Sequence, residues 1–97
     1  MSITRHESGP RMSQAVVHGN TVYLAGVVAD DPKADVKGQA QQILAKIDRL
    51  LATAGSSKAK ALSANIWLSD MRTFAQMNEV WDAWVDKANP PARATVE

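Results

Sequence analysis

The strongest constraint on the fold is a stripe of apolar residues with helical period in the first half of the chain. Its members recur at spacings of three and four residues: Val36, Ala40, Ile43, Ile47, Leu50 and Ala54. This spacing places them on one side of an α-helix, which has to be buried against other elements. We predict a helix that begins near Asp35 and ends at Gly55, because glycine readily takes the left-handed conformation that follows a helix.

Two segments before this helix have the composition of β-strands. Residues 14–18 and 21–28 flank Gly19 and Asn20, a pair that is typical of hairpin turns. The second segment is apolar nearly throughout, which predicts a strand buried on both faces. Gly26, near its end, is expected to allow the close approach of another backbone.

A third segment, residues 61–69, alternates between two faces as a half-buried strand does. One face carries Leu62, Ala64, Ile66 and Leu68, and the other carries Ser63, Asn65, Trp67 and Ser69. Trp67 therefore lies on the more polar face. Because an exposed tryptophan is unusual, we expect another subunit to cover that face in part.

A second helix and a short strand complete the pattern. Ser69 or Asp70 can cap the helix, whose apolar stripe is formed by Phe74, Met77, Trp81 and Trp84 or Val85. Asn89-Pro90-Pro91 is expected to end it, and residues 92–97 have the composition of a strand. The order strand, hairpin, helix, strand, helix, strand predicts one α+β domain over residues 1–97, with a mixed β-sheet and both helices on one sheet face.

Composition excludes several classes of protein. The 97 residues contain no cysteine, and the net charge of +1 comes without the basic run that is typical of nucleic-acid binding. His6 and His18 have no carboxylates at metal-ligand spacing, so no metal site is predicted. The chain has neither a membrane-spanning apolar stretch nor the apolar core of a signal peptide, and we expect a cytoplasmic protein.

Four segments match the motifs of a known family, in the right order and over nearly the whole chain. They are Gly9-Pro10 with Ser13-Gln14-Ala15-Val16, then Tyr23-Leu24-Ala25-Gly26, then residues 74–84, then Pro91-Ala92-Arg93-Ala94-Thr95-Val96-Glu97. Each motif alone has low specificity, whereas the ordered set is fairly specific. On these segments the sequence resembles a divergent branch of the RidA/YjgF family of imine/enamine deaminases.

The resemblance implies a chorismate-mutase-like α+β fold that assembles into homotrimers, with ligand clefts between neighbouring subunits. Members with the complete site hydrolyse reactive imines or enamines of amino-acid metabolism to 2-keto acids and ammonia, without a metal or an organic cofactor. The implied partners are small carboxylate-bearing imines or 2-keto acids and further copies of the same chain. No membrane is predicted as a partner, and the balanced charge disfavours a nucleic acid.

By the same resemblance, Arg93 is the expected catalytic and substrate-anchoring residue. An arginine fork holds a carboxylate through two parallel hydrogen bonds. Gly26, Asn78 and Thr95 are the other expected substrate-binding residues. Gly26 and Thr95 would act through backbone groups that orient the imine and a water. Asn78 lies on the predicted second helix, where a polar side chain can face a neighbouring subunit.

The sequence departs from the family's deaminases at several positions. Met12 stands where they usually have a tyrosine, Ala25 where they usually have a serine, and Thr95 where they often have a cysteine. A glutamate on a final strand is absent, since Glu97 lies too early to be that residue. We expect the chain to be a truncated version of a longer product, with a general acid or base supplied by the absent strand or by a neighbouring subunit.

Two other functions stay open beside an enzymatic one. A non-catalytic trimer that binds a small ligand, or regulates through it, would keep the cleft without the chemistry, and the apolar Met12 and Ala25 favour it. RNA cleavage, an activity attributed to some relatives, is disfavoured by the balanced charge and by the lack of a paired acid and base.

Overall fold

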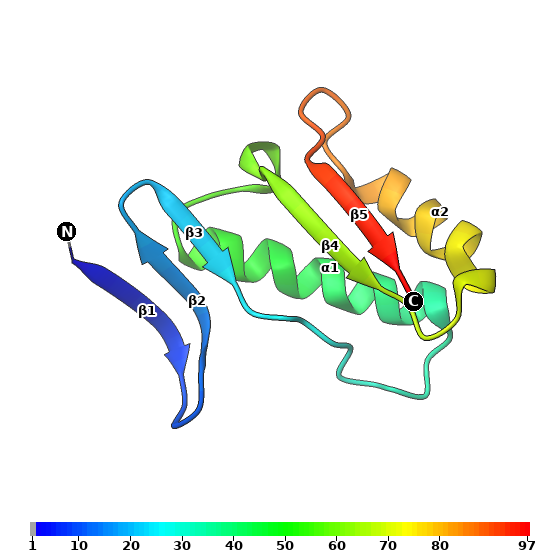
Figure 1. Cartoon of the computed structure of the whole chain (residues 1–97), viewed down its shortest axis with the longest axis horizontal. Helices are drawn as coiled ribbons and strands as arrows, with labels where there is room; N and C mark the ends of the chain where they lie inside the picture. Colours follow the sequence, from blue (N-terminus) through cyan, green and yellow to red (C-terminus); the bar gives the residue numbers. More distant parts are fainter. Residues whose placement is uncertain (1) are drawn as a thin grey trace.

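The computed structural model describes residues 2–97, which form an α+β fold (Figure 1). The elements in chain order are β1 (Ile3–Ser8), β2 (Ser13–His18), β3 (Thr21–Leu24), α1 (Val36–Thr53), the 3-10 turn η1 (Lys58–Lys60), β4 (Ser63–Trp67), the 3-10 turn η2 (Met71–Thr73), α2 (Phe74–Trp84) and β5 (Ala92–Val96). This succession confirms the predicted order of strands and helices.

β2 and β3 form the predicted hairpin around Gly19, whose φ of 60° glycine adopts without strain. β3 ends at Leu24 rather than at residue 28, and Val28 is 73% exposed. The prediction of a strand buried on both faces was therefore wrong. The physical reason is that no strand within residues 2–97 pairs with the outer edge of β3, so nothing continues the ladder there.

The strands form two sheets rather than the single mixed sheet that we predicted. β1, β2 and β3 make an antiparallel sheet, and β4 and β5 make a separate parallel pair. Parallel pairing requires a crossover connection, which α2 provides between β4 and β5. Antiparallel and parallel ladders are both present, but within the described residues no ladder joins β3 to β4.

α1 confirms the predicted first helix at both ends. The Asp35 side chain caps its N-terminus by accepting a hydrogen bond from the Gly38 amide at 2.8 Å. Gly55 follows its C-terminus with a φ of +81°, and the amides of Gly55 and Ser56 donate back to carbonyls of the last turn. This is the Schellman arrangement that a left-handed glycine makes possible.

α2 begins as predicted but ends earlier. Asp70 accepts a hydrogen bond from the Arg72 amide at 2.9 Å and so caps the turn η2 that leads into the helix. The helix stops at Trp84, well before Asn89, because the Asp86 side chain accepts a hydrogen bond from the Ala88 amide at 3.0 Å. Such a local side-chain contact competes with helix continuation. The prolines therefore follow a turn rather than ending the helix.

The core lies between the helices and one side of the strands, and the other side is open. Buried apolar side chains come from β2, α1 and α2: Ala15, Leu44, Leu50 and Met77. On the open side Tyr23 is 59%, Trp67 69% and Val96 47% exposed, and Trp67 is the register partner of Val96. No helix within residues 2–97 is long and apolar enough to cross a membrane.

Replacing Gly55 by alanine is expected to lower the free energy of unfolding by about 1 kcal/mol, because alanine is strained at a positive φ. Gly26→Ala is the matched control: its φ lies outside the left-handed region, and no atom lies within 4 Å of a Cβ built there. Urea unfolding of both variants measures the difference. A loss of stability at Gly26 as large as that at Gly55 would contradict the expectation.

Candidate functional site

Arg93 lies on the face of β5 that is turned toward α2. In the parallel register Arg93 is opposite Ala64 and Thr95 is opposite Ile66, so these four side chains share the inner face of the β4–β5 pair. The alternate positions of β5 point outward and are exposed: Ala92, Ala94 and Val96. The period of two along a strand thus brings Arg93 and Thr95 to one surface.

Arg93 is held by three side chains of α2. Its Nη1 donates a hydrogen bond to Asn78 Oδ1 at 2.7 Å. Its Cζ lies 5.2 Å from the ring centroid of Trp81 and 5.8 Å from that of Phe74, within the range of a cation–π interaction. Phe74 and Trp81 are about 10 Å apart along the helix axis, because they are separated by two turns. The guanidinium therefore contacts rings from two different turns of α2, and Asn78 lies in the turn that separates them.

The sequence named Asn78 and Arg93 as separate candidates but missed the roles of Phe74 and Trp81. Helical periodicity assigned both rings to the apolar core stripe, because it cannot separate a ring packed in the core from one stacked on a cation. The available signal was the polar Asn78 inside that stripe, four residues after Phe74 and three before Trp81. Residues at these spacings lie on one side of a helix.

The charge of Arg93 has no acidic partner within residues 2–97. The ion pairs there are Lys37–Glu79, Lys46–Asp30, Arg49–Glu7 and Arg72–Asp70. Arg93 Nη1 is engaged with a neutral amide, and among the described residues Nε and Nη2 have no acceptor. These two nitrogens form an edge that can donate two parallel hydrogen bonds to a carboxylate. The site is therefore a half-buried, uncompensated cation with its carboxylate-binding edge available.

Thr95 lies beside Arg93 on β5, and its hydroxyl is unpaired. The Oγ1 atom is buried and has no hydrogen-bond partner among residues 2–97. A buried hydroxyl without a partner costs about 1–3 kcal/mol relative to one that is satisfied. We had expected a backbone role for Thr95, and the sequence carried no signal for an unpaired side-chain oxygen.

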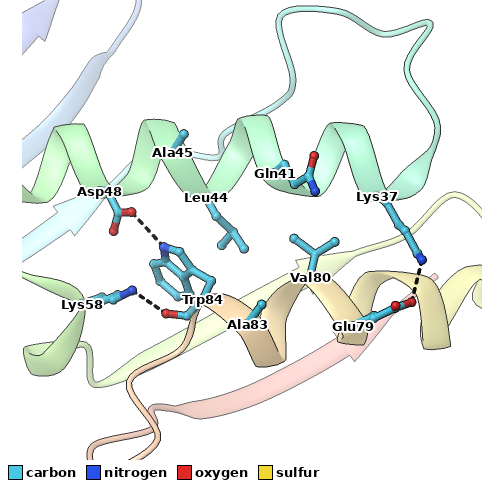
Figure 2. A pocket seen from close by; sticks show the side chains of 10 residues that line it. All are labelled: Lys37, Gln41, Leu44, Ala45, Asp48, Lys58, Glu79, Val80, Ala83 and Trp84. Carbon is cyan, nitrogen blue, oxygen red and sulfur yellow. Dashed lines mark hydrogen bonds and ion pairs between the residues drawn. The ribbon is translucent and has the colours of Figure 1, made fainter.

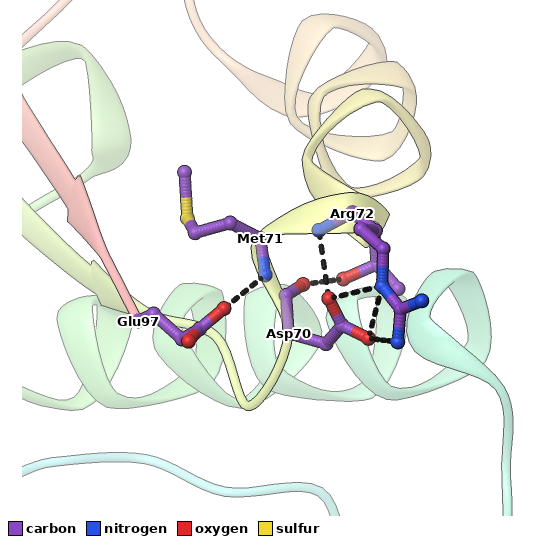
Figure 3. A network of polar contacts seen from close by, with 5 residues as sticks. Asp70, Met71, Arg72 and Glu97 are labelled. Carbon is purple, nitrogen blue, oxygen red and sulfur yellow. Dashed lines mark hydrogen bonds and ion pairs between the residues drawn. The ribbon is translucent and has the colours of Figure 1, made fainter.

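A polar network joins the end of β5 to the start of α2 (Figure 3). Glu97 Oε1 accepts a hydrogen bond from the Met71 amide at 2.8 Å, and Arg72 donates from Nε and Nη2 to the carboxylate of Asp70. Hydrogen bonds from the Arg72 side chain and then from its backbone amide hold the pKa of Asp70 below its ordinary value. The network ties the strand that carries Arg93 to the helix that carries Asn78.

Gly26 stands apart from these residues. No atom lies within 4 Å of a Cβ built on it, so the expected close approach of another backbone does not occur within residues 2–97. It follows β3 in the antiparallel sheet, whereas Arg93 belongs to the parallel pair. Met12, in the turn between β1 and β2, is 48% exposed. One chain thus brings Arg93, Asn78 and Thr95 together and leaves Gly26 outside the cluster.

A groove of about 550 Å³ lies between α1 and α2, away from the predicted site residues (Figure 2). Its apolar lining consists of Leu44, Ala45, Val80 and Ala83. Three contacts pair polar groups at its rim: Lys37 with Glu79 at 2.7 Å, Trp84 Nε1 with Asp48 at 3.0 Å, and Lys58 with the Trp84 carbonyl at 2.5 Å. Gln41 also lines the groove. Because most of the polar groups are already paired, the groove offers a ligand little polar recognition.

Potential metal ligands are not gathered in the part of the chain that the structure describes. No three His, Cys, Asp or Glu side chains there lie close enough to hold an ion. His6 pairs with Ala15 and His18 with Ile3, at separate positions of the β1–β2 ladder. That the site works without a metal or an organic cofactor stays a prediction.

The fold and the site define an α+β protein with a half-buried arginine suited to an organic anion. The sequence model of the family described as Endoribonuclease L-PSP matches residues 3–97. A RutC family protein of Haemophilus influenzae is 43% identical over 98 residues, which cover 100% of this chain and 84% of the relative. The RutC family protein YoaB of Escherichia coli K12 is 42% identical over 97 residues, with the same coverage.

Solved structures agree with these relatives. A member of the YjgF protein family from Neisseria meningitidis has a TM-score of 0.96 and 44% identity, covering 100% of this chain and 81% of that one. An uncharacterized protein from Pseudomonas aeruginosa has a TM-score of 0.95 and 42% identity, covering 99% and 84%. The chain belongs to the Endoribonuclease L-PSP family, and its predicted membership of the RidA/YjgF group is confirmed.

Thr95→Val is expected to raise the free energy of unfolding by about 1 kcal/mol, because it removes an unpaired buried hydroxyl and keeps the shape of the side chain. Thr73→Val is the matched control: the Thr73 hydroxyl donates to the Asp70 carbonyl at 2.7 Å, so its loss should lower stability. Denaturant unfolding of both variants measures whether the free energy of unfolding rises or falls in each. A destabilised Thr95→Val protein would show that the hydroxyl is satisfied in solution.

Proposed function

We propose that the protein hydrolyses reactive imine or enamine intermediates of amino-acid metabolism to 2-keto acids and ammonia. The single observation that carries the proposal is Arg93, a half-buried cation whose only side-chain hydrogen bond within residues 2–97 goes to the neutral Asn78. A 2-imino acid has a carboxylate beside its C=N bond. Anchoring that carboxylate would place the reacting carbon at a fixed distance from Arg93.

The electrostatics of the cluster support a carboxylate rather than a neutral ligand. A half-buried charge that has lost part of its hydration gains most from a partner of opposite charge. The rings of Phe74 and Trp81 stabilise the guanidinium and leave its edge available. A charge-assisted hydrogen bond contributes about 1.5–3 kcal/mol, so the anchor alone accounts for roughly 10- to 100-fold in ligand affinity.

The proposed chemistry needs only water as a co-reactant. The water oxygen adds to the electrophilic carbon of the protonated imine, and the resulting carbinolamine loses ammonia as its C–N bond breaks and the C=O bond forms. Arg93 holds the carboxylate through both steps, while backbone groups near Gly26 and Thr95 orient the imine and the water. Catalysis of this kind rests on positioning and on preorganised dipoles. A neighbouring subunit supplies the general acid or base.

A homotrimer is part of the proposal, because one chain leaves both a sheet face and the site incomplete. Tyr23, Trp67 and Val96 expose large apolar surfaces on the side without helices, and surfaces of this kind usually mark an interface. Packing the open faces of three copies together would cover them. It would also allow Gly26 of one subunit to approach Arg93 of another across a cleft.

The protein is expected to sediment at about three times the chain mass of 10.5 kDa. Trp67→Glu should shift it toward the monomer, because the substitution places a charge in the apolar contact. Asp82→Lys, a charge change on the exposed side of α2, is the control and should leave the mass unchanged. Analytical ultracentrifugation separates the species, and a wild-type protein that stays monomeric at micromolar concentration would refute the trimer.

The activity is tested in a coupled assay, in which an L-amino-acid oxidase releases 2-imino acids and semicarbazide traps those that have not been hydrolysed. The protein should speed the loss of trappable imine. Arg93→Ala should reduce the acceleration of imine loss about 10- to 100-fold. Arg93→Lys, which keeps the charge but not the two-pronged geometry of the guanidinium, should retain only part of the wild-type acceleration. Arg49→Ala is the control, since Arg49 is exposed and already paired with Glu7.

The outcomes separate the proposed activity from its alternatives. No acceleration across a panel of imino acids, with 2-keto acids still bound, would favour a non-catalytic binding trimer. The description of the matching family names an endoribonuclease, so the protein is also assayed for cleavage of a single-stranded RNA at low salt. RNA cleavage that survives Arg93→Ala would direct the search away from this site.

A further inference from the structure

We infer that Asn78 is a positioning residue that fixes Arg93 while leaving its charge uncompensated, so that the ligand itself must bring the negative charge. The inference rests on the proposed function and adds to it the cause of selectivity for a carboxylate. It assigns to Asn78 a role through Arg93, in place of the direct substrate contact that the sequence predicted.

In the contact between the two side chains, Arg93 must be the hydrogen-bond donor and Asn78 the acceptor. A guanidinium has donors only, so the atom that faces it must be an acceptor, and the amide of Asn78 has a single acceptor atom, Oδ1. The observed hydrogen bond from Arg93 Nη1 to Oδ1, at 2.7 Å, satisfies this requirement. It holds the guanidinium by one nitrogen and turns the Nε–Nη2 edge away from the helix side chain.

The same chain shows what a carboxylate does to an arginine. The carboxylate of Asp70 receives hydrogen bonds from Nε and Nη2 of Arg72 at 2.7–3.1 Å, which occupies the edge that Arg93 keeps available. Arg49 is likewise paired with Glu7. An acidic residue at position 78 would give Arg93 an internal anion. The neutral amide gives it orientation without neutralisation.

The aromatic neighbours make a neutral partner sufficient. Trp81 and Phe74 lie 5.2 and 5.8 Å from Cζ of Arg93 and stabilise a cation through their ring faces without accepting a proton or cancelling the charge. Together with one amide oxygen they hold a half-buried guanidinium in place. A carboxylate ligand then completes the electrostatic balance, whereas a neutral amide or alcohol does not.

The test uses Asn78→Asp, which changes charge with almost no change of shape, and 2-oxobutyrate as the probe in calorimetric titration of the full-length protein. Asn78→Asp should weaken binding of 2-oxobutyrate at least about tenfold, because the introduced carboxylate competes for the same guanidinium. In the imine-hydrolysis assay it should raise KM far more than it lowers kcat. Its Tm should equal or exceed that of the wild type. Asn89→Asp, the same chemical change at an exposed loop position, is the control.

Asn78→Ala gives a second reading that does not depend on a new charge. It removes the acceptor and leaves the Arg93 charge intact, so binding should weaken about three- to tenfold, less than in Asn78→Asp. If Asn78→Asp binds 2-oxobutyrate as the wild type does, the inference is overturned. The same holds if affinity falls only together with Tm. A wild-type protein that binds no 2-keto acid would overturn the proposed function as well, and the wild-type titration identifies that case.

Discussion

The contact between Arg93 and α2 is the interaction on which the candidate site depends. It exists because β5 is parallel to β4 and α2 makes the crossover between them, which sets Arg93 beside residues that come 12 to 19 positions earlier, Trp81 and Phe74. The polar network at Met71 and Glu97 closes the other end of the same unit. The geometry of the cluster around Arg93 is thus a property of one β-α-β unit.

The remainder of the fold is governed by an apolar surface that one chain does not cover. Both helices lie on one side of the strands, and within residues 2–97 only four apolar residues are buried. A chain of this size has little core to stabilise it, and apolar side chains such as Trp67 stay exposed on the other side. Self-association would relieve both problems with the same contact, since burying the open face also enlarges the core.

Local signals were sufficient to predict α1, the hairpin turn, β4 and β5, because periodicity, the Asp35 cap and the left-handed Gly55 all act over a few residues. The end of α2 was predicted wrongly, since the turn at Asp86 competes with the helix through a side-chain contact. The split into two sheets was also missed. Strand pairing depends on which edges meet in space, and composition carries no signal for that.

The sequence named Arg93, Asn78 and Thr95 as candidate site residues, and the structure brings these three together. It leaves the fourth candidate, Gly26, apart from them, and it adds two aromatic rings that the sequence had assigned to the core. The motif around Arg93 pointed to an anchor, yet the sequence could not show that this cation lacks an acidic partner or that two rings flank it, because such facts depend on tertiary packing. Once the packing is known, the absence of a carboxylate beside Arg93 within residues 2–97 becomes informative. A paired arginine stabilises a fold, whereas an oriented and unpaired one retains its affinity for an anion from outside.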